Sequence, residues 1–146
     1  MITTSSLNEV YKQLKEESKP ALILAHDEKF NRTLLENAKF TALVMNHQAQ
    51  KKDKLKSLDI PLNDVLAKIA KKKNIALAYD LKVLRLLHYQ EQACELSRIM
   101  KTIEVCRKAG TDLAILNAYT VEGAKALLRA LGASSQQANQ ALVFNQ

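Results

Sequence analysis

The stretch PLNDVLAKIAKKKNIALAY, residues 61–79, decides the fold, because it reads as a helix followed at once by a buried strand. Pro61 suits the first turn of a helix, where its missing N–H has no partner to lose. The run IALAY, residues 75–79, is apolar without alternation, which is typical of a strand covered on both faces. The predicted buried stripe of the helix, set by helical spacing, is Leu62, Val65, Leu66 and Ile69.

The same unit recurs on both sides of this stretch. Apolar runs at residues 21–25 (ALILA), 41–45 (TALVM) and 113–116 (LAIL) predict three further strands, with helical spacing between them. A capping box at Ser134 predicts a last short helix that includes Leu142. Alternating strands and helices favour a parallel sheet, either an open doubly wound sheet or an arc of a βα barrel. We therefore expect an α/β fold with about four parallel strands and flanking helices.

Length and composition set the wider limits. The chain has 146 residues, of which 47% are hydrophobic and 25% charged, so we expect one domain over residues 1–146. No apolar run approaches the length of a membrane span and the first residues lack the features of a signal peptide, so we expect a cytoplasmic, soluble protein. Cys94 and Cys106 form no CxxC pair, which makes a zinc site or a disulfide improbable.

The positive charge is concentrated in one part of the chain. The net charge is +7, and residues 51–108 hold 14 Lys or Arg against 7 Asp or Glu. A localised positive field attracts a polyanion by neutralising phosphates and releasing counterions. Nucleic acid is therefore the leading partner class, while a solvated lysine surface without a ligand remains the alternative.

Six polar residues follow the predicted strands, at the edge where ligands of parallel α/β sheets gather. Three of them, His26, Asp27 and Asp80, could hold a metal and activate water, which would make the protein a small metal-dependent hydrolase. No HxH, HExxH, GxSxG or glycine-rich phosphate loop occurs, and capping or turn roles explain such residues as well. The other three are Asn46, His47 and Asn117.

Basic residues are stronger candidates at the same edge. If the strands are parallel, the lysines after the second strand and the basic residues after the third emerge together. Arginine forks match phosphate geometry and lysines act as point charges, so the expected ligand is structured RNA or DNA held through its backbone. The predicted RNA-binding residues are Lys51, Lys52, Lys54, Lys56, Lys82, Arg85 and Arg98, with no catalytic and no metal-ligating residue.

Three segments also resemble a known family. Residues 57–84 (SLDIPLNDVLAKIAKKKNIALAYDLKVL), 98–118 (RIMKTIEVCRKAGTDLAILNA) and 126–142 (ALLRALGASSQQANQAL) are similar to the archaeal and eukaryotic ribonuclease P protein family, protein component 3 in archaea and the thirty-kilodalton subunit in eukaryotes. Residues 20–46 fit more loosely. The residues that match the family motifs are Leu62, Asn63, Val65, Leu66, Ala70, Ala76, Asp80, Arg98, Met100, Cys106, Arg107 and Lys108.

The resemblance implies a TIM-barrel-like scaffold without an active site of its own. In such a ribonucleoprotein the RNA, with magnesium, removes the 5′ leader of precursor tRNA, and the protein supports that RNA. The implied partners are ribonuclease P RNA, a ferredoxin-like protein subunit in a heterotetramer and, indirectly, precursor tRNA, with no cofactor bound by this chain. Of the matching residues, Arg98 is the best candidate for RNA contact.

The sequence also departs from the family. Nothing before Ala21 supplies the family's additional N-terminal strands, Pro61 stands where a glycine is expected, and the turn at residues 117–120 is short. We therefore expect the N-terminal part of the family barrel to be missing. The resulting hypothesis is a short form whose open sheet is completed by a second copy or by another chain.

Overall fold

A computed structural model describes residues 1–16, 20–47, 53, 58–60 and 62–145 of the chain. Its helices are α1 (Leu7–Glu16), α2 (Glu28–Asn37), α3 (Asp64–Lys73), α4 (Leu81–Leu86), α5 (Tyr89–Ala109), α6 (Val121–Ala130) and α7 (Ser135–Gln140). Its strands are β1 (Leu22–Leu24), β2 (Ala42–Val44), β3 (Ala76–Asp80), β4 (Leu113–Leu116) and β5 (Leu142–Phe144). The predicted α/β fold of parallel strands and flanking helices is confirmed.

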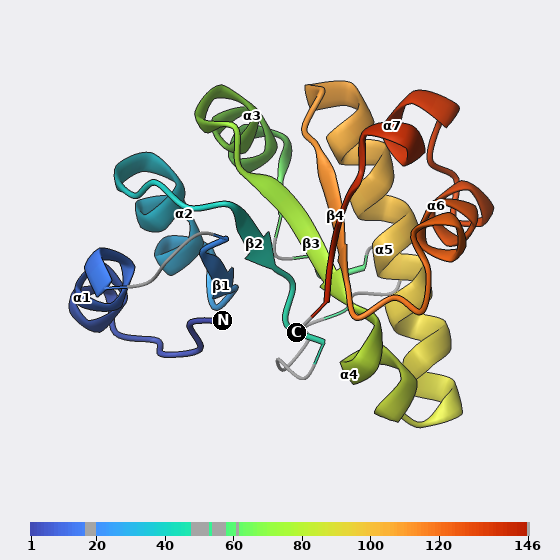
Figure 1. The fold of residues 1–146 in the computed structure, drawn as a ribbon, viewed down its shortest axis with the longest axis horizontal. Coiled ribbons are helices and arrows are strands. Elements are labelled where there is room, and N and C mark those ends of the chain that lie inside the picture. The colour runs from blue at the N-terminus through green and yellow to red at the C-terminus, as the bar shows by residue number, and fades with distance from the viewer. Residues whose placement is uncertain (17–19, 48–52, 54–57, 61, 146) are drawn as a thin grey trace.

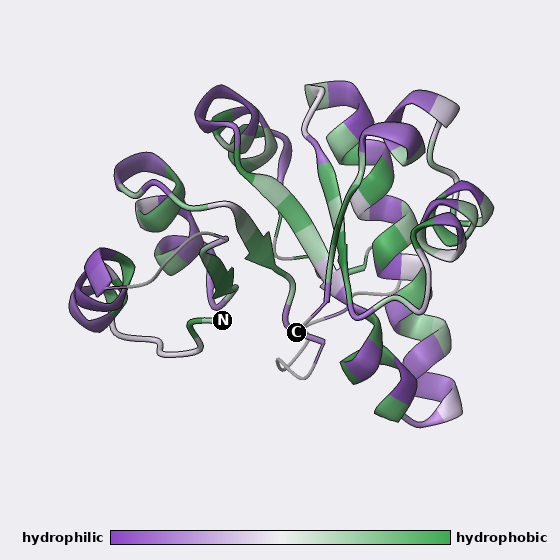
Figure 2. Ribbon diagram, in the orientation of Figure 1, coloured by the Kyte–Doolittle hydropathy of each residue, from purple (hydrophilic) through white to green (hydrophobic). Residues whose placement is uncertain are grey.

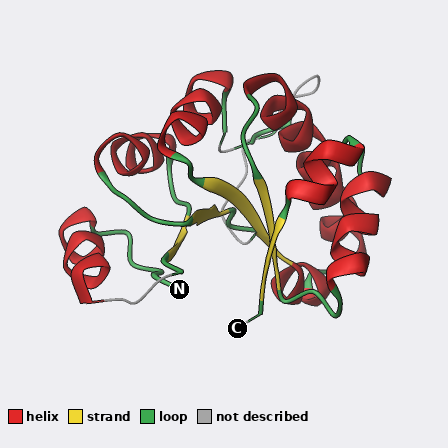
Figure 3. Cartoon of the chain, turned by 45° about the horizontal axis from the view of Figure 1, so that its top comes forward, coloured by secondary structure: helices red, strands yellow, loops and turns green. Residues whose placement is uncertain are grey.

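Each strand of the described sheet lies beside the strand that precedes it in the chain. The order is β1-β2-β3-β4-β5 and the pairings are parallel, for example Ala42 opposite Ala76 and Leu77 opposite Leu113. A doubly wound sheet would reverse its strand order at a switch point. The helices instead follow one another around one side of the sheet (Figures 1 and 3). Of the two expected architectures, the arc of a βα barrel is therefore the observed one.

The two faces of the sheet are buried in different ways. Ile23, Leu43 and Leu77 belong to the main core, which packs against the helices. Alternate residues, such as Ala42 and Ala76, form a second and smaller cluster on the opposite face. Figure 2 shows hydrophobic residues on the strands and on the helix sides that meet them. Burial on both faces explains why the strands read as continuous apolar runs.

Helix α3 begins later than the sequence predicts. Asn63 is its N-cap, and the Asn63 side chain accepts a hydrogen bond of 2.9 Å from the backbone N–H of Leu66. Leu62 and Leu66 are buried as predicted, whereas Val65 is 55% exposed. The place of Val65 in the buried stripe is wrong, because a helix that starts at Asp64 turns Val65 toward solvent. Pro61 lies outside the described residues.

The prediction at the C-terminal end needs a correction. The capping box is present, with Ser134 as N-cap and Gln137 as its partner, but α7 ends at Gln140. Leu142 is therefore not helical: it begins β5, a fifth strand that pairs with β4. A three-residue apolar run directly after a short helix carries too weak a pattern to separate the two elements.

Residues 81–90, which follow β3, are largely helical. Helix α4 occupies most of this segment, and His88 is the N-cap of α5. The His88 backbone N–H donates to the Glu91 carboxylate at 3.2 Å. This short helix matters for function because it carries Lys82 and Arg85.

Two expectations from composition concern membranes and cysteines. No helix in the described ranges is long and apolar enough to cross a membrane. Cys94 is exposed, Cys106 is buried, and both thiols are free.

Candidate nucleic-acid interface

Parallel pairing brings the carboxyl ends of the strands to one edge of the sheet, here called the C-terminal edge. His47 follows β2, Asp80 ends β3 and Asn117 follows β4 at this edge. Helix α4 begins directly after β3, so Lys82 and Arg85 lie at the same edge. The sequence prediction that basic residues after the third strand emerge at this edge agrees with the parallel register.

Asp80 fixes the start of α4. Its carboxylate is 6% exposed and accepts hydrogen bonds from the backbone N–H of Lys82 at 2.8 Å and from the Asn117 amide at 2.9 Å. Asn117 has a left-handed backbone with φ of 56°, which turns the chain sharply after β4. Asp80 thus links the end of β3, the first turn of α4 and the loop after β4.

Arg85 lies across this junction and contacts an exposed aromatic ring. Its Nη2 donates to the Asn117 carbonyl at 3.3 Å, and its Cζ lies 4.1 Å from the centroid of the Tyr119 ring. Tyr119 is 87% exposed, so the ring and the guanidinium form a cation–π pair at the surface. Sequence reasoning missed Tyr119. Its position in the loop directly after β4, at the same edge as α4, is the signal that could have found it.

Arg98 does not lie where the sequence led us to expect it. It is 7% exposed, and its Nη1 donates to the Glu95 carboxylate at 2.7 Å, while its Nη2 contacts the Asp53 carboxylate. The reason is its position on α5, because Glu95, Arg98 and Thr102 are all buried on one side of that helix. A guanidinium held between two carboxylates in this way serves to position Asp53 and is not an exposed cation.

The buried contact continues to the end of β2. Nδ1 of His47 lies 3.0 Å from Glu95 Oε2, and the His47 ring lies 5.6 Å from that of Tyr79. Burial raises the pKa of the Tyr79 hydroxyl far above its usual value. Glu95 therefore contacts both His47, which follows β2, and Arg98, which in turn contacts Asp53.

The four predicted lysines Lys51, Lys52, Lys54 and Lys56 lie outside the described residues. Asp53, which stands among them in the sequence, is described, and its carboxylate contacts Arg98. The remaining predicted cations at the C-terminal edge are Lys82 and Arg85, and both are exposed.

The residues of the hydrolase alternative have structural roles. The Asp27 carboxylate caps α2 by accepting from the backbone N–H of Phe30 at 2.8 Å. The His26 ring meets the Phe30 ring edge-on at 4.8 Å, and the His26 backbone bonds to the Asn31 amide. Asp80 caps α4. A search of the described residues finds no group of three or more His, Cys, Asp or Glu that could hold a metal ion.

The arrangement defines a class: an open arc of a βα barrel with exposed cations and an exposed aromatic ring, that of Tyr119, at its C-terminal edge. No family model and no curated protein matches the chain. A chain in a cryo-EM structure of archaeal ribonuclease P with mature tRNA is similar, with a TM-score of 0.73 and 21% sequence identity. The match covers 95% of this chain and 61% of that chain, so this chain spans less than two thirds of its length. At this identity the likeness shows a shared fold.

Proposed function

We propose that the chain is a non-catalytic protein subunit of a ribonuclease P ribonucleoprotein, which binds the catalytic RNA during removal of the 5′ leader from precursor tRNA. The single observation that carries the proposal is the likeness over 95% of the chain to a chain of archaeal ribonuclease P. The sequence resemblance of residues 57–84, 98–118 and 126–142 supports the same complex. Catalysis then belongs to the RNA and its magnesium.

The RNA contact in this proposal lies at the C-terminal edge. Lys82 and Arg85 neutralise backbone phosphates, and Lys51, Lys52, Lys54 and Lys56 add further positive charge after the second strand. Tyr119 offers the ring face that Arg85 does not cover to an unpaired base. Arg98 is no longer in the contact set, because it is buried between Glu95 and Asp53.

The test is a titration of the full chain with a ribonuclease P RNA transcript at several salt concentrations. The variant Lys82→Gln/Arg85→Gln should raise Kd about tenfold and lower the salt slope by about two, because two phosphate contacts are lost. The control Lys68→Gln/Lys101→Gln removes the same charge from exposed positions within α3 and α5, and we expect Kd to stay within about twofold of wild type because these positions are distant from the edge.

Tyr119 gives a second readout that does not depend on charge. Tyr119→Ala should weaken binding about threefold to tenfold with an unchanged salt slope, because stacking involves no counterion release. Tyr119→Phe retains the ring and should bind as wild type does. RNA affinity that is insensitive to salt, to the Lys82/Arg85 change and to Tyr119→Ala would contradict the proposed function.

The partners follow from the same proposal. A ferredoxin-like protein subunit and ribonuclease P RNA bind this chain directly, and precursor tRNA meets it through the complex. We also propose that a second chain, either a copy of this one or another protein, completes the sheet beyond β5. Among the described residues only β4 pairs with β5, and Leu142 at that edge is 41% exposed. Light scattering that shows a stable monomer, alone and with the partner subunit, would contradict this assembly.

A further inference from the structure

The positive charge of the chain is divided between two edges of the sheet. Lys71, Lys72 and Lys73 form the last turn of α3, immediately before β3 begins. They therefore lie at the edge where the strands start, here called the N-terminal edge, opposite Lys82 and Arg85.

A cleft of about 540 Å³ opens at the N-terminal edge. Two of the α3 lysines, Lys72 and Lys73, line it from one side, and Lys39, from the segment between α2 and β2, lines it from another. Thr41 and Asn74 add a hydroxyl and an amide, and the described lining residues include no carboxylate. A set of three ammonium groups with neutral polar side chains is suited to a ligand that carries negative charge.

The backbone around the cleft is held firmly. Asn74 ends α3 in a left-handed conformation with φ of 55°, and its N–H bonds to the carbonyls of Ala70 and Lys71. The Thr41 N–H donates to the Ala21 carbonyl at 2.8 Å, and the Thr41 carbonyl accepts from Ala76 at 3.1 Å. Hydrogen bonds between the N-terminal ends of β1, β2 and β3 therefore fix the backbone from which the lysines project.

Lys39, Lys72 and Lys73 are exposed, and within the described ranges none of the three forms an ion pair. The favourable position of cations at a helix C-terminus accounts for Lys72 and Lys73. It does not account for Lys39, which belongs to no helix and faces the same cleft. Three like charges around one space repel each other, and a bound anion would relieve that repulsion.

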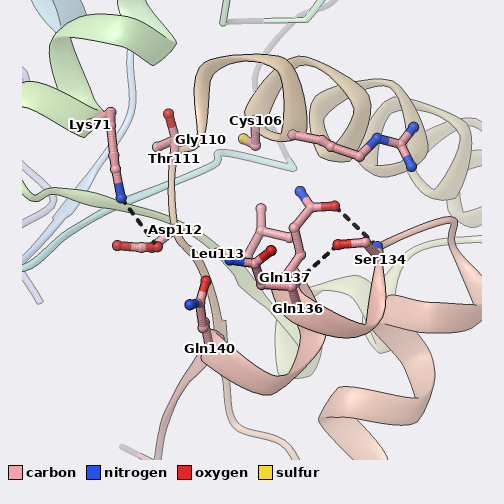
Figure 4. Close-up of a pocket in the computed structure, with 11 residues that line it drawn as sticks. Lys71, Cys106, Gly110, Thr111, Asp112, Leu113, Ser134, Gln136, Gln137 and Gln140 are labelled. Atoms are coloured by element: carbon pink, nitrogen blue, oxygen red, sulfur yellow. Dashed lines mark hydrogen bonds and ion pairs between the residues drawn. The ribbon is translucent and has the colours of Figure 1, made fainter.

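A neighbouring cavity at the same edge gives a contrast. This cavity of about 320 Å³ lies beside α5 and α7, and Figure 4 shows Lys71 joined to Asp112 and Ser134 joined to Gln137. Lys71 lies 3.8 Å from the Asp112 carboxylate, and Ser134 and Gln137 form the capping box of α7. In this cavity Asp112 meets the charge of Lys71, whereas no carboxylate among the described residues lines the Lys39 cleft.

We propose that the Lys39 cleft binds the phosphodiester backbone of RNA, as a second contact at the edge opposite Arg85. The inference rests on the proposed function, because that function supplies the RNA. In this assignment Lys39, Lys72 and Lys73 neutralise phosphates, while Thr41 and Asn74 donate to phosphate oxygens. One RNA thus meets the chain at both edges of the sheet.

The experiment titrates a ribonuclease P RNA transcript against the variant Lys39→Gln/Lys72→Gln/Lys73→Gln of the full chain. We expect Kd to rise about tenfold or more at low salt and the salt slope to fall by about two to three. The matched control, Lys12→Gln/Lys68→Gln/Lys101→Gln, removes the same charge from exposed positions within α1, α3 and α5. Circular dichroism of both variants should match wild type because every changed side chain is exposed, and the melting temperature of the cleft variant should fall only slightly, because Lys72 and Lys73 lose their favourable position at the C-terminus of α3.

A second arm separates a polymer backbone from a small phosphate ligand. Amide NMR signals of Thr41 and Asn74 should shift with RNA at micromolar concentration, and with uridine monophosphate or inorganic phosphate only at millimolar concentration. Saturation by either small molecule at micromolar concentration would overturn the inference, and so would a cleft variant that binds RNA as its control does.

The two proposals can fail separately. If Lys82→Gln/Arg85→Gln weakens RNA binding and the cleft variant does not, the inference is wrong and the proposed function stands. If the wild-type chain shows no salt-sensitive RNA binding, the proposed function fails and the inference fails with it. If both variants weaken binding, and their combination weakens it further, both proposals are supported.

Discussion

The two edges of the sheet carry cations in different ways. At the C-terminal edge, Arg85 is fixed by a hydrogen bond to Asn117 and by the Tyr119 ring, and Asp80 anchors the helix from which it projects. At the N-terminal edge, Lys39, Lys72 and Lys73 project from fixed backbone, but within the described residues their ammonium groups form no ion pair.

This difference teaches what each edge can contribute to RNA binding. A guanidinium held in one orientation loses little conformational freedom on binding, so it can fix the register of an RNA backbone. Unpaired lysines add affinity that depends on salt and little on orientation. We therefore expect the C-terminal edge to determine which RNA structure is bound and the N-terminal edge to strengthen that binding.

The largest effect should come from the buried charges under the C-terminal edge. Arg98→Met removes one partner of the buried Glu95 carboxylate and the partner of Asp53, and breaking this buried ion pair should lower the free energy of unfolding by up to about 3–5 kcal/mol. Urea denaturation measures this change. Lys101→Met, which breaks an exposed pair with Glu104 at 2.9 Å, is the control and should change stability little.

A double variant sharpens this result. Glu95→Gln/Arg98→Met removes both charges, so it should recover part of the stability lost in Arg98→Met alone. No recovery would mean that the buried pair is not the source of the loss. Both variants leave the lysines of the N-terminal edge unchanged, so the cleft contact should persist in any variant that remains folded.

A smaller effect is expected at Asp80. Asp80→Ala removes the cap of α4 and the acceptor of the Asn117 amide, which should cost about 1–2 kcal/mol of stability and loosen Arg85. Thermal unfolding and the NMR signals of the Arg85 guanidinium measure the two consequences. Asp80→Asn retains an acceptor oxygen and should fall between Asp80→Ala and wild type; equal losses in the two variants would contradict the capping role.

Features of the fold that depend on local sequence patterns were predictable, and features that depend on contacts with other segments were not. Strands such as residues 75–79 were predictable because burial on both faces leaves a continuous apolar run, and the edge of Lys82 and Arg85 followed from parallel pairing. Val65 and Leu142 were misplaced because a helix start and a short final strand depend on neighbours that a local pattern does not contain.

The candidate site was less predictable than the fold. Arg98 reads as a free cation in the sequence, but its burial depends on Glu95 one helical turn away and on Asp53, 45 residues away. The Lys39 cleft joins the loop before β2 with the end of α3, and no single motif contains both. Contacts between distant segments therefore decide which cations remain available to a ligand.

The smallest expected effect concerns the reactivity of the two thiols, which lie nearer opposite ends of α5. Cys94 is exposed in the part of the helix nearer the C-terminal edge, and Cys106 is fully buried in the part nearer the N-terminal edge. Burial raises the pKa of the Cys106 thiol to about 12. At pH 8 a thiol reagent should therefore modify Cys94 quickly, and Cys106 only when the core opens.

The raised pKa of Cys106 also sets the direction in which stability changes with pH. Above about pH 8.5 the Cys106 thiol ionises in the unfolded chain but stays protonated in the fold, so stability falls as the pH rises further. Cys106→Ala should remove that part of the pH dependence, at the cost of a small cavity.

Labelling of the Cys94→Ser variant over time measures the opening rate at the N-terminal edge. Equal rates for the two thiols would mean that the buried side of α5 is as open to the reagent as its exposed surface, which would contradict the burial of Cys106.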